Sequence, residues 1–523
     1  MSEHTTVSEL RNQFGPENVL TGDTADPFAT DVYRKLRDPL AVVRPASAQK
    51  LQELVQFCAG RAIAFTIRGG GASYTDGYLA VDDRHLLIDL GRLKDIQIVE
   101  AGGYVTVEAG VTWAELSEAL AKKGLRTPFR GPFSGLHATI AGSVSQNSLS
   151  HGTGKYGISA ESVLSLDVVM ADGSLLRTGS RIAGAEPFAR HFGPDLTGLF
   201  TGDCGAFGVK ASVTLPIMRQ RPAHRAISFA FSDFASMHQA MRAIALEKIE
   251  DTHFAIDAAL SQGQIARQDT AGGQFALALS ILRSSPSIAA GLRQLVGALA
   301  RSRKQIGAAA YTVHYMVEGF SDAETKAKLA RIRTLAADGP NANSHEIEAT
   351  VPAVVRAMPF APFYNTLGPK GERWVPLHGI LPHSRVAEFH RMYEEFLAGR
   401  AAEMEALGIW IGAMFSAVGP SGFLYEIAIY WPDERSSYHL AVVPADYLSQ
   451  LPEYPPNPGA RAAVEEIKQG LVALYDAHDA VHFQLGRAYP YKSRIDPQAR
   501  ALIEAVKAFA DPDGRIGPGV LGL

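Results

Sequence analysis

Three stretches of the chain concentrate glycine and hydroxyl residues in patterns that suit the binding of a phosphorylated cofactor. The first, IRGGGASYTDG at 67–77, follows an apolar segment, so its three consecutive glycines bring backbone N–H groups close to an anion. Ser73 adds a hydroxyl donor and Arg68 adds a positive charge. A plain tight turn is the alternative interpretation, but a turn rarely needs three glycines in succession.

The second stretch, at 130–157, contains GTGKYG, which matches the dinucleotide fingerprint G-x-G-x-x-G. That fingerprint needs a buried strand before it and a helix after it. Here the preceding residues are polar, and residues 161–180 predict a strand, an Asp-Gly turn and another strand. Tyr156 stands where a phosphate loop requires Ser or Thr after its lysine. Neither nucleotide loop is therefore predicted, and the small residues of the stretch instead favour contact with a planar ligand.

The third stretch, at 195–217, joins a glycine cluster to an alternating strand and contains Cys204. A nucleophilic role for Cys204 requires a cation or base that lowers the pKa of its thiol, so this role is not favoured. Cys58 lies on a predicted helix, where a packing role is expected. Two cysteines are too few for a disulfide framework or a metal cage, and no paired histidines have ligand spacing, so we expect no metal.

Strands and helices alternate around these stretches. Residues 40–45 predict a strand that ends at a proline, and residues 47–61 predict a helix with Ser47 as its N-cap. A further helix is expected after Thr112, with Glu115 completing a capping box. The short connections indicate a mixed α and β half.

The pattern changes near the prolines at 216 and 222. Predicted strands at 224–231, 274–282 and 423–431 are mixed with predicted helices at 285–305 and 384–408. This mixture is typical of an antiparallel α+β domain. A proline-rich connector, PEYPPNPG, then precedes one more helix and the tail.

In this order the motifs resemble the FAD-binding domain of the vanillyl-alcohol oxidase / para-cresol methylhydroxylase superfamily, over about residues 40–217. That superfamily also contains flavin-linked D-lactate and glycolate dehydrogenases, aldonolactone oxidases and alkyl-dihydroxyacetone-phosphate synthase. ADPDGRIGPG, at 510–519, resembles the terminal return to the flavin domain. The resemblance implies an α+β fold: a PCMH-type FAD-binding domain of two subdomains at 1–220, an antiparallel substrate (cap) domain at 221–447, and a segment at 448–523 that returns to the FAD domain and the active site.

The resemblance also implies which residues hold FAD. The pyrophosphate is expected against Arg68, Gly69, Gly70, Gly71, Ala72 and Ser73; the isoalloxazine and the rest of the cofactor against Ser134, Thr139, Gly142, Ser143, Gly152 and Gly157; and the adenine near Gly208 and Val209. Ala72 replaces the histidine of relatives with a histidyl flavin, so the FAD is expected to have no covalent link from this loop. A link from the cap domain stays open.

Alcohol oxidation by a flavin needs groups that take the hydroxyl proton and stabilise the charge on the reduced ring. The middle domain offers His378 on a predicted strand, and 423–431 offers Tyr425, Glu426, Tyr430 and Trp431. A lone histidine on an apolar strand is more often a satisfied core residue. The tail HFQLGRAYPY is dense in polar and aromatic groups, and relatives turn this region toward the flavin. We expect the catalytic residues to be His378, His482, Arg487 and Tyr489.

The predicted function is that of an FAD-dependent oxidase or dehydrogenase acting on the CH–OH carbon of an alcohol, an aromatic or phenolic one because the cap is rich in aromatic residues. One alternative is a D-2-hydroxy-acid dehydrogenase of the lactate or glycolate type, although such relatives usually carry a GEHG-type tail and metal-ligating histidines. Another is a non-redox FAD enzyme of the same fold. The electron acceptor (oxygen, a cytochrome or a quinone) and a homo-oligomeric state stay open.

Composition excludes several other classes. The chain of 523 residues has a net charge of −4 and no basic run flanked by aromatics, so no nucleic acid partner is expected. No apolar stretch is long enough to span a membrane. The polar N-terminus lacks a signal-peptide pattern, so a cytoplasmic enzyme acting on a small molecule is expected.

Overall fold

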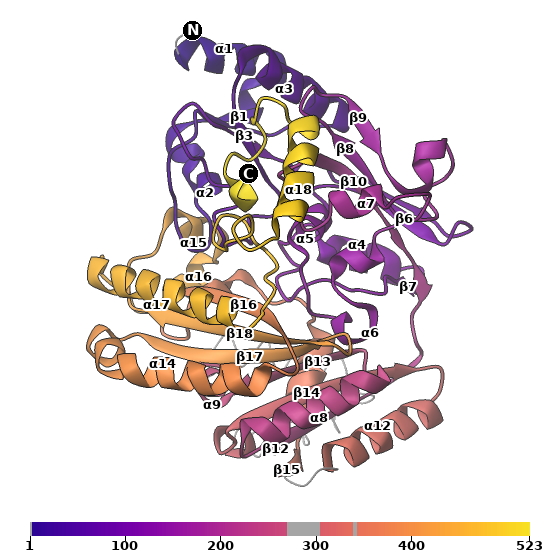
Figure 1. Cartoon of the computed structure of the whole chain (residues 1–523), viewed down its shortest axis with the longest axis vertical. Coiled ribbons are helices and arrows are strands. Elements are labelled where there is room, and N and C mark those ends of the chain that lie inside the picture. Colours follow the sequence, from indigo (N-terminus) through magenta and orange to yellow (C-terminus); the bar gives the residue numbers. More distant parts are fainter. Residues whose placement is uncertain (1–2, 269–303, 338–342) are drawn as a thin grey trace.

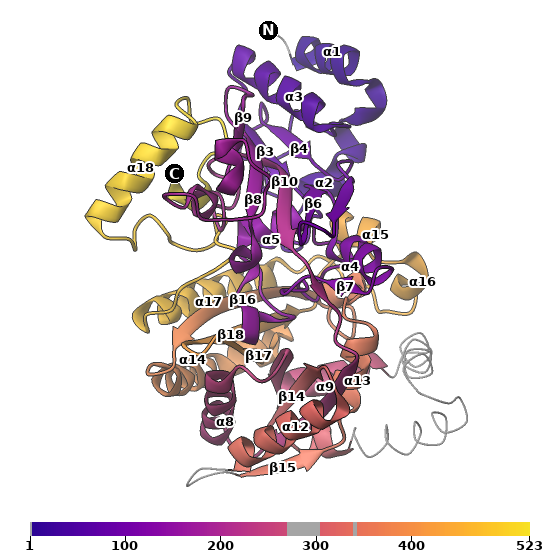
Figure 2. The same cartoon turned by 90° about the vertical axis from the view of Figure 1, so that its right-hand side faces the viewer.

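The computed structural model describes residues 3–268, 304–337 and 343–523. The predicted strand at 274–282 and nearly all of the predicted helix at 285–305 lie outside these residues. Figures 1 and 2 both show the N-terminal half above a large sheet, with the yellow C-terminal helix α18 returning beside the N-terminal half. The architecture is α+β, as predicted.

The N-terminal half contains two sheets. A four-stranded sheet has the order β1-β2-β4-β3, in which β4 pairs in parallel with both β2 and β3. A five-stranded antiparallel sheet has the order β5-β6-β10-β8-β9. The strands are β1 (Val19–Leu20), β2 (Ala41–Val43), β3 (Phe65–Arg68), β4 (Leu86–Asp89), β5 (Ile96–Val99), β6 (Tyr104–Glu108), β8 (Ser165–Val169), β9 (Leu175–Arg177) and β10 (Val209–Pro216).

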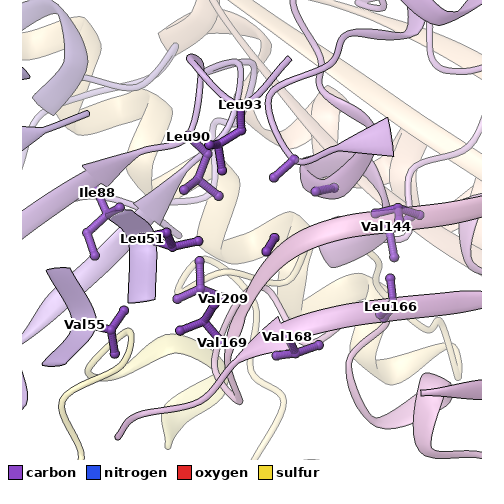
Figure 3. Packing of buried hydrophobic residues seen from close by; sticks show 14 of the residues in the cluster. Leu51, Val55, Ile88, Leu90, Leu93, Val144, Leu166, Val168, Val169 and Val209 are labelled. Atoms are coloured by element: carbon purple, nitrogen blue, oxygen red, sulfur yellow. The ribbon is translucent and has the colours of Figure 1, made fainter. Parts of the chain in front are cut away.

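Local sequence signals account for the helices between these strands. The side chain of Ser47 accepts a hydrogen bond from the Lys50 N–H, so α3 (Ala48–Arg61) begins where the N-cap predicts. Thr112 and Glu115 form the predicted capping box of α4 (Trp113–Ala121). Apolar side chains of both sheets, α3 and α5 (Ile140–Gln146) form one core; Figure 3 shows Leu51, Val55, Ile88, Val144, Val168 and Val209 within it.

The large sheet is antiparallel and seven-stranded, with the order β15-β12-β14-β13-β17-β18-β16. Four helices pack their apolar residues on one of its faces. The strands are β12 (Ala223–Phe231), β13 (Thr252–Asp257), β14 (Tyr311–Gly319), β15 (Ser344–Ile347), β16 (Arg373–Pro382), β17 (Trp410–Val418) and β18 (Gly422–Trp431); the helices are α8 (Phe234–Glu247), α12 (Asp322–Ala337), α14 (Val386–Leu407) and α17 (Pro458–Ala477).

The opposite face of this sheet meets the N-terminal half. Side chains alternate between the faces of a strand, so the neighbours of the helix-packed Tyr425 and Ile427 point away from the helices. Leu424 accordingly packs with Leu149, and Tyr430 shares an apolar cluster with Phe133. The sheet thus presents one face of β16 and β18 to the glycine-rich stretches.

The last part of the chain connects the two halves. Helix α17 rests on the large sheet, and the chain then crosses back, where the Gln484 N–H donates to the Gln146 carbonyl at 2.8 Å. Beyond α18 (Pro497–Ala510), the N–H of Phe65 donates to the Arg515 carbonyl and Gly517 donates to the Phe65 carbonyl, both at 2.8 Å. The tail therefore returns to the N-terminal half, as predicted.

The remaining elements are short or peripheral. None of the helices in the described parts of the chain is long and apolar enough to cross a membrane. These elements are α1 (Glu3–Phe14), α2 (Asp26–Ala29), β7 (Leu125–Arg126), α6 (Thr153–Tyr156), α7 (Leu196–Leu199), β11 (Met218–Arg219), α9 (Ala258–Gln268), α13 (Thr350–Ala357), α15 (Ser437–Val442) and α16 (Ala445–Leu448).

Candidate active site

A cavity of about 890 Å³, part of it open to solvent, lies where all three glycine-rich stretches meet. The loop after β3 forms one wall, the start of α5 another, and the segment before β10 a third. Gln484 closes one end from the returning tail. Ten of the predicted cofactor residues line this cavity: Gly69, Gly70, Gly71, Ala72, Ser73, Ser134, Thr139, Gly142, Ser143 and Gly208.

Four predicted cofactor residues lie elsewhere. Arg68 lines a neighbouring cavity that shares two glycines and Thr139 with the first, and it is held in a buried ion pair with Asp89 at 2.6 Å. Gly152, Gly157 and Val209 do not line either cavity: the two glycines flank α6, and Val209 is buried in the core.

Close packing explains why glycine is needed in the loop after β3. A Cβ atom on Gly70 would lie 1.6 Å from the carbonyl oxygen of His137, and one on Gly69 would lie 2.4 Å from Oγ1 of Thr139. Side chains at these positions would force the two walls apart. The result is a narrow opening lined by main chain and hydroxyl groups, which fits the pyrophosphate and the flat ring of FAD.

The GTGKYG motif serves the contact between the two halves. A Cβ atom on Gly154 would lie 2.4 Å from Oε1 of Glu250, in the turn before β13, and 2.8 Å from Cε1 of His253. Lys155 lies 3.5 Å from Oδ1 of Asp251. The motif therefore packs against the end of the large sheet. This tertiary contact explains why the motif does not line the cavity.

A buried ion cluster reinforces the same contact. Glu318, on β14, pairs with Arg126 at 3.0 Å and with Arg130 at 3.2 Å, both from the FAD-binding half, and with Arg356 at 2.8 Å. Burial alone would raise the pKa of Glu318, but the three arginines lower it to about 2. This carboxylate is therefore ionised wherever the protein is folded.

His378 is fully buried at the junction of the cavity with the large sheet. Its ring stacks on Phe483 at 3.9 Å between centroids and lies edge-on to Tyr74 at 5.8 Å. Neither ring nitrogen makes a hydrogen bond of good geometry within the described residues. Burial lowers its pKa to about 3, assisted by His482 and opposed by the Gln484 side chain. The imidazole is therefore neutral near pH 7.

The other three predicted catalytic residues surround the His378 main chain or hold the tail. The hydroxyl of Tyr489 accepts a hydrogen bond from the His378 N–H, and Nδ1 of His482 lies 2.8 Å from the His378 carbonyl oxygen. Arg487 donates to the backbone carbonyls of Asp76, Leu79 and Pro518. Burial lowers the pKa of Arg487 to about 10. These contacts position the tail and β16.

Glu426 lies beside His378, and its position was not chosen from the sequence. The two residues are direct partners in the antiparallel pairing of β16 and β18. The carboxyl group of Glu426 makes no hydrogen bond or ion pair among the described residues, and burial alone raises its pKa to about 7. The available signal was a single carboxyl group within the apolar strand FLYEIAIYW.

Like Glu426, Gln484 lay in a stretch singled out from the sequence but was not among the expected site residues, and Tyr74 was not considered for the site. Tyr74 directly follows the glycine-rich loop, and its ring lies 5.8 Å from that of Trp374. The Gln484 side chain hydrogen-bonds to Tyr74 and thereby opposes the rise that burial causes in the Tyr74 pKa. These residues connect the cavity to His378 and Glu426. No group of three or more His, Cys, Asp or Glu residues suited to a metal occurs in the described ranges.

Comparison with known proteins identifies the cofactor. Residues 39–179 match a family described as the FAD binding domain. The glycolate oxidase subunit GlcD of Bacillus subtilis (strain 168) is 26% identical over 221 residues, which are 42% of this chain and 45% of that protein. The chain thus spans about half the length of the curated relatives it matches.

Two solved structures share the fold over nearly the whole chain. p-Cresol methylhydroxylase with substrate bound has a TM-score of 0.72 at 17% identity, covering 99% of this chain and 96% of that one. Alkyldihydroxyacetonephosphate synthase has a TM-score of 0.69 at 14% identity, covering 99% and 85%. At such identities the likeness shows the fold alone.

Proposed function

We propose that this chain is an FAD-dependent oxidoreductase that oxidises the CH–OH group of a neutral aromatic alcohol. It has the FAD-binding domain and the fold of the vanillyl-alcohol oxidase / para-cresol methylhydroxylase superfamily. Bound FAD supplies the two-electron acceptor for the hydride. The observation that carries the proposal is the junction of the glycine-lined cavity with His378 and Glu426, because Gln484 lines the cavity and also interacts with His378.

The charges around this junction favour a neutral substrate. Glu426 has its pKa raised by burial, with no cation acting to lower it. Arg487 is bound to backbone carbonyls, and His378 is neutral near pH 7. A substrate carboxylate placed here would meet another carboxyl group without a compensating positive charge. The rings of Tyr74, Trp374 and Phe483 instead support an aromatic substrate.

The predicted catalytic residues take separate parts in this proposal. His378 contacts the substrate hydroxyl through a neutral ring nitrogen and orients it. Tyr489 and His482, whose rings stack on each other, hold the His378 main chain through its N–H and its carbonyl oxygen. Arg487 positions the tail segment that carries Gln484. The FAD is held without a covalent bond from the RGGGAS loop, which has Ala72 and no histidine.

Two further activities have specific support. A D-2-hydroxy-acid dehydrogenase is favoured by the sequence likeness to a glycolate oxidase subunit. A non-redox FAD enzyme is favoured by the structural likeness to alkyldihydroxyacetonephosphate synthase. Both would use the same cavity.

Anaerobic bleaching of the yellow protein separates the three activities. The proposal expects loss of flavin colour with aryl alcohols and no loss with glycolate or D-lactate. Bleaching by the hydroxy acids alone would establish the second activity, and no bleaching by either panel would favour the third. Return of colour in air would identify oxygen as the electron acceptor, whereas return only with a cytochrome or quinone would identify an electron-transfer partner.

A further inference from the structure

We infer that Glu426 is the catalytic base that takes the hydroxyl proton of the substrate, a role that rests on the proposed function. Its carboxyl group lies on the face of β18 that meets the FAD-binding half, directly across the strand pair from His378. Met414, its partner on β17, brings no charge to the site. The base is therefore placed by the register of the sheet, on rigid secondary structure.

The surroundings of Glu426 keep its carboxylate free to accept a proton. The carboxyl group makes no hydrogen bond or ion pair among the described residues. The titratable groups near it are His378 on β16, Tyr74 after the glycine-rich loop and Tyr489 in the tail; Tyr475 on α17 packs on the opposite face of the sheet. Burial raises the pKa of each tyrosine and lowers that of His378, so all four are neutral near pH 7.

The reaction balances with Glu426 as the proton acceptor. The O–H bond of the alcohol breaks and its proton passes to the Glu426 carboxylate, while the oxygen electron pair forms the carbonyl double bond. FAD held by the glycine-lined cavity would supply the two-electron acceptor for the hydride that leaves as the C–H bond breaks. A base is most effective when its pKa lies near the working pH, and burial raises the pKa of Glu426 to about 7.

Two substitutions test this role on the holoenzyme. In Glu426→Gln we expect FAD binding to persist and anaerobic bleaching by an aryl alcohol to slow by about 100-fold or more. The wild-type bleaching rate should rise with pH through an apparent pKa near 7, and this limb should vanish in Glu426→Gln. Glu426→Asp should keep the limb at a lower rate, because it retains a carboxyl group.

Infrared difference spectra give a readout independent of turnover. Raising the pH from about 5 to about 9 should remove a protonated carboxyl band from the wild type. The part of this band that titrates near pH 7 should be smaller by one carboxyl group in Glu426→Gln, whereas buried Asp31, whose pKa is also raised to about 7, contributes to both proteins. Glu250→Gln is the matched control, since Glu250 is a buried glutamate whose pKa burial raises to about 8. This control should keep the Glu426 component and the pH limb of bleaching.

The outcomes distinguish the inference from the proposed function. Wild-type protein that no aryl alcohol bleaches would overturn both. Wild-type bleaching that Glu426→Gln matches in rate and pH dependence would overturn the role of Glu426 alone. A carboxyl component near pH 7 that is equally large in the wild type and in Glu426→Gln would likewise count against the assignment, because Asp31 contributes the same component to both proteins.

Discussion

The hydroxyl of Tyr489 accepts a hydrogen bond of 3.0 Å from the backbone N–H of His378. A residue of the returning tail is thereby bound to the strand that carries the candidate site. His482 makes the second contact, to the carbonyl oxygen of the same residue, and stacks on Tyr489 at 4.1 Å between centroids. Through these two contacts, the tail fixes the position of the large sheet relative to the cavity.

Replacing Tyr489 by Phe should loosen this geometry. The substitution keeps the ring but leaves the buried His378 N–H without its acceptor, at a cost of about 1–3 kcal/mol in the free energy of unfolding. Bleaching by an aryl alcohol should slow about tenfold, since small misplacements of reacting groups are costly. Thermal melting and stopped-flow absorbance measure the two effects. Tyr491→Phe is the control, because the Tyr491 hydroxyl is half-buried and has no hydrogen-bond partner in the described tail.

Replacing Gly70 by Ala should prevent FAD binding. The new Cβ would overlap the His137 carbonyl oxygen, and neither backbone can move without opening the cavity. We expect most of the absorbance near 450 nm to be lost, with a destabilisation of about 1–3 kcal/mol. Gly60→Ala, in helix α3, has nothing within 4 Å of the new atom and should retain FAD. Full flavin content in Gly70→Ala would contradict the placement of FAD against this loop.

The FAD should leave the protein when the protein is denatured. Ala72 offers no side chain that can bond to the flavin ring, so acid precipitation should leave the yellow colour in the supernatant. Mass spectrometry of the pellet should then give the mass of the unmodified chain. Flavin retained in the pellet would instead reveal a covalent link from the large sheet or its neighbouring loops.

The contribution of Glu250 to the stability of the folded protein should fall as the pH rises from about 5 to about 8. Burial raises the pKa of Glu250 to about 8, from 4.5 for a free glutamate, so the folded state holds this proton more tightly than the unfolded chain. The stabilisation is complete below pH 4.5 and is lost as the pH passes through about 8. The pKa of Glu318 is lowered, so its contribution to stability changes only at more acidic pH.

Glu250→Gln should reduce this fall, because glutamine cannot ionise. The melting temperature of wild type and variant, measured across the pH range, checks the sign. Glu388→Gln, at an exposed position on α14, should leave the slope unchanged. A slope equally steep in Glu250→Gln would show that other buried acids, such as Glu426, account for the effect.

Local patterns predicted several helix starts and one wall of the cavity, whereas the individual residues of the other walls came from the family resemblance. Ser47 and the Thr112–Glu115 pair predicted helix starts because capping depends on residues close in sequence. The loop at 69–73 was predicted as a cofactor wall because successive glycines have few other uses. Such signals need no knowledge of the rest of the fold.

Contacts between segments that lie far apart in the chain could not be predicted from the sequence. GTGKYG looked like a cofactor motif, but Gly154 is needed for contact with Glu250, in a segment far along the chain. Arg487 looked catalytic, but its donors are taken by carbonyls of loops near Leu79 and Pro518. The importance of Glu426 depends on which face of β18 meets the cavity, and periodicity alone does not identify that face.

The crossing of the tail has a consequence for biosynthesis. Gln484 forms part of the cavity, and Phe65 pairs with Arg515 and Gly517 near the end of the chain. Until residues 484–517 have been synthesised, the N-terminal half therefore lacks the residue that closes one end of its cofactor site, and β3 has its neighbour β4 but not the pairing of Phe65 with the tail. We expect FAD to be loaded only after residues 484–517 have joined the N-terminal half, so the maturation of this enzyme depends on the supply of flavin to a chain that has been synthesised at least this far.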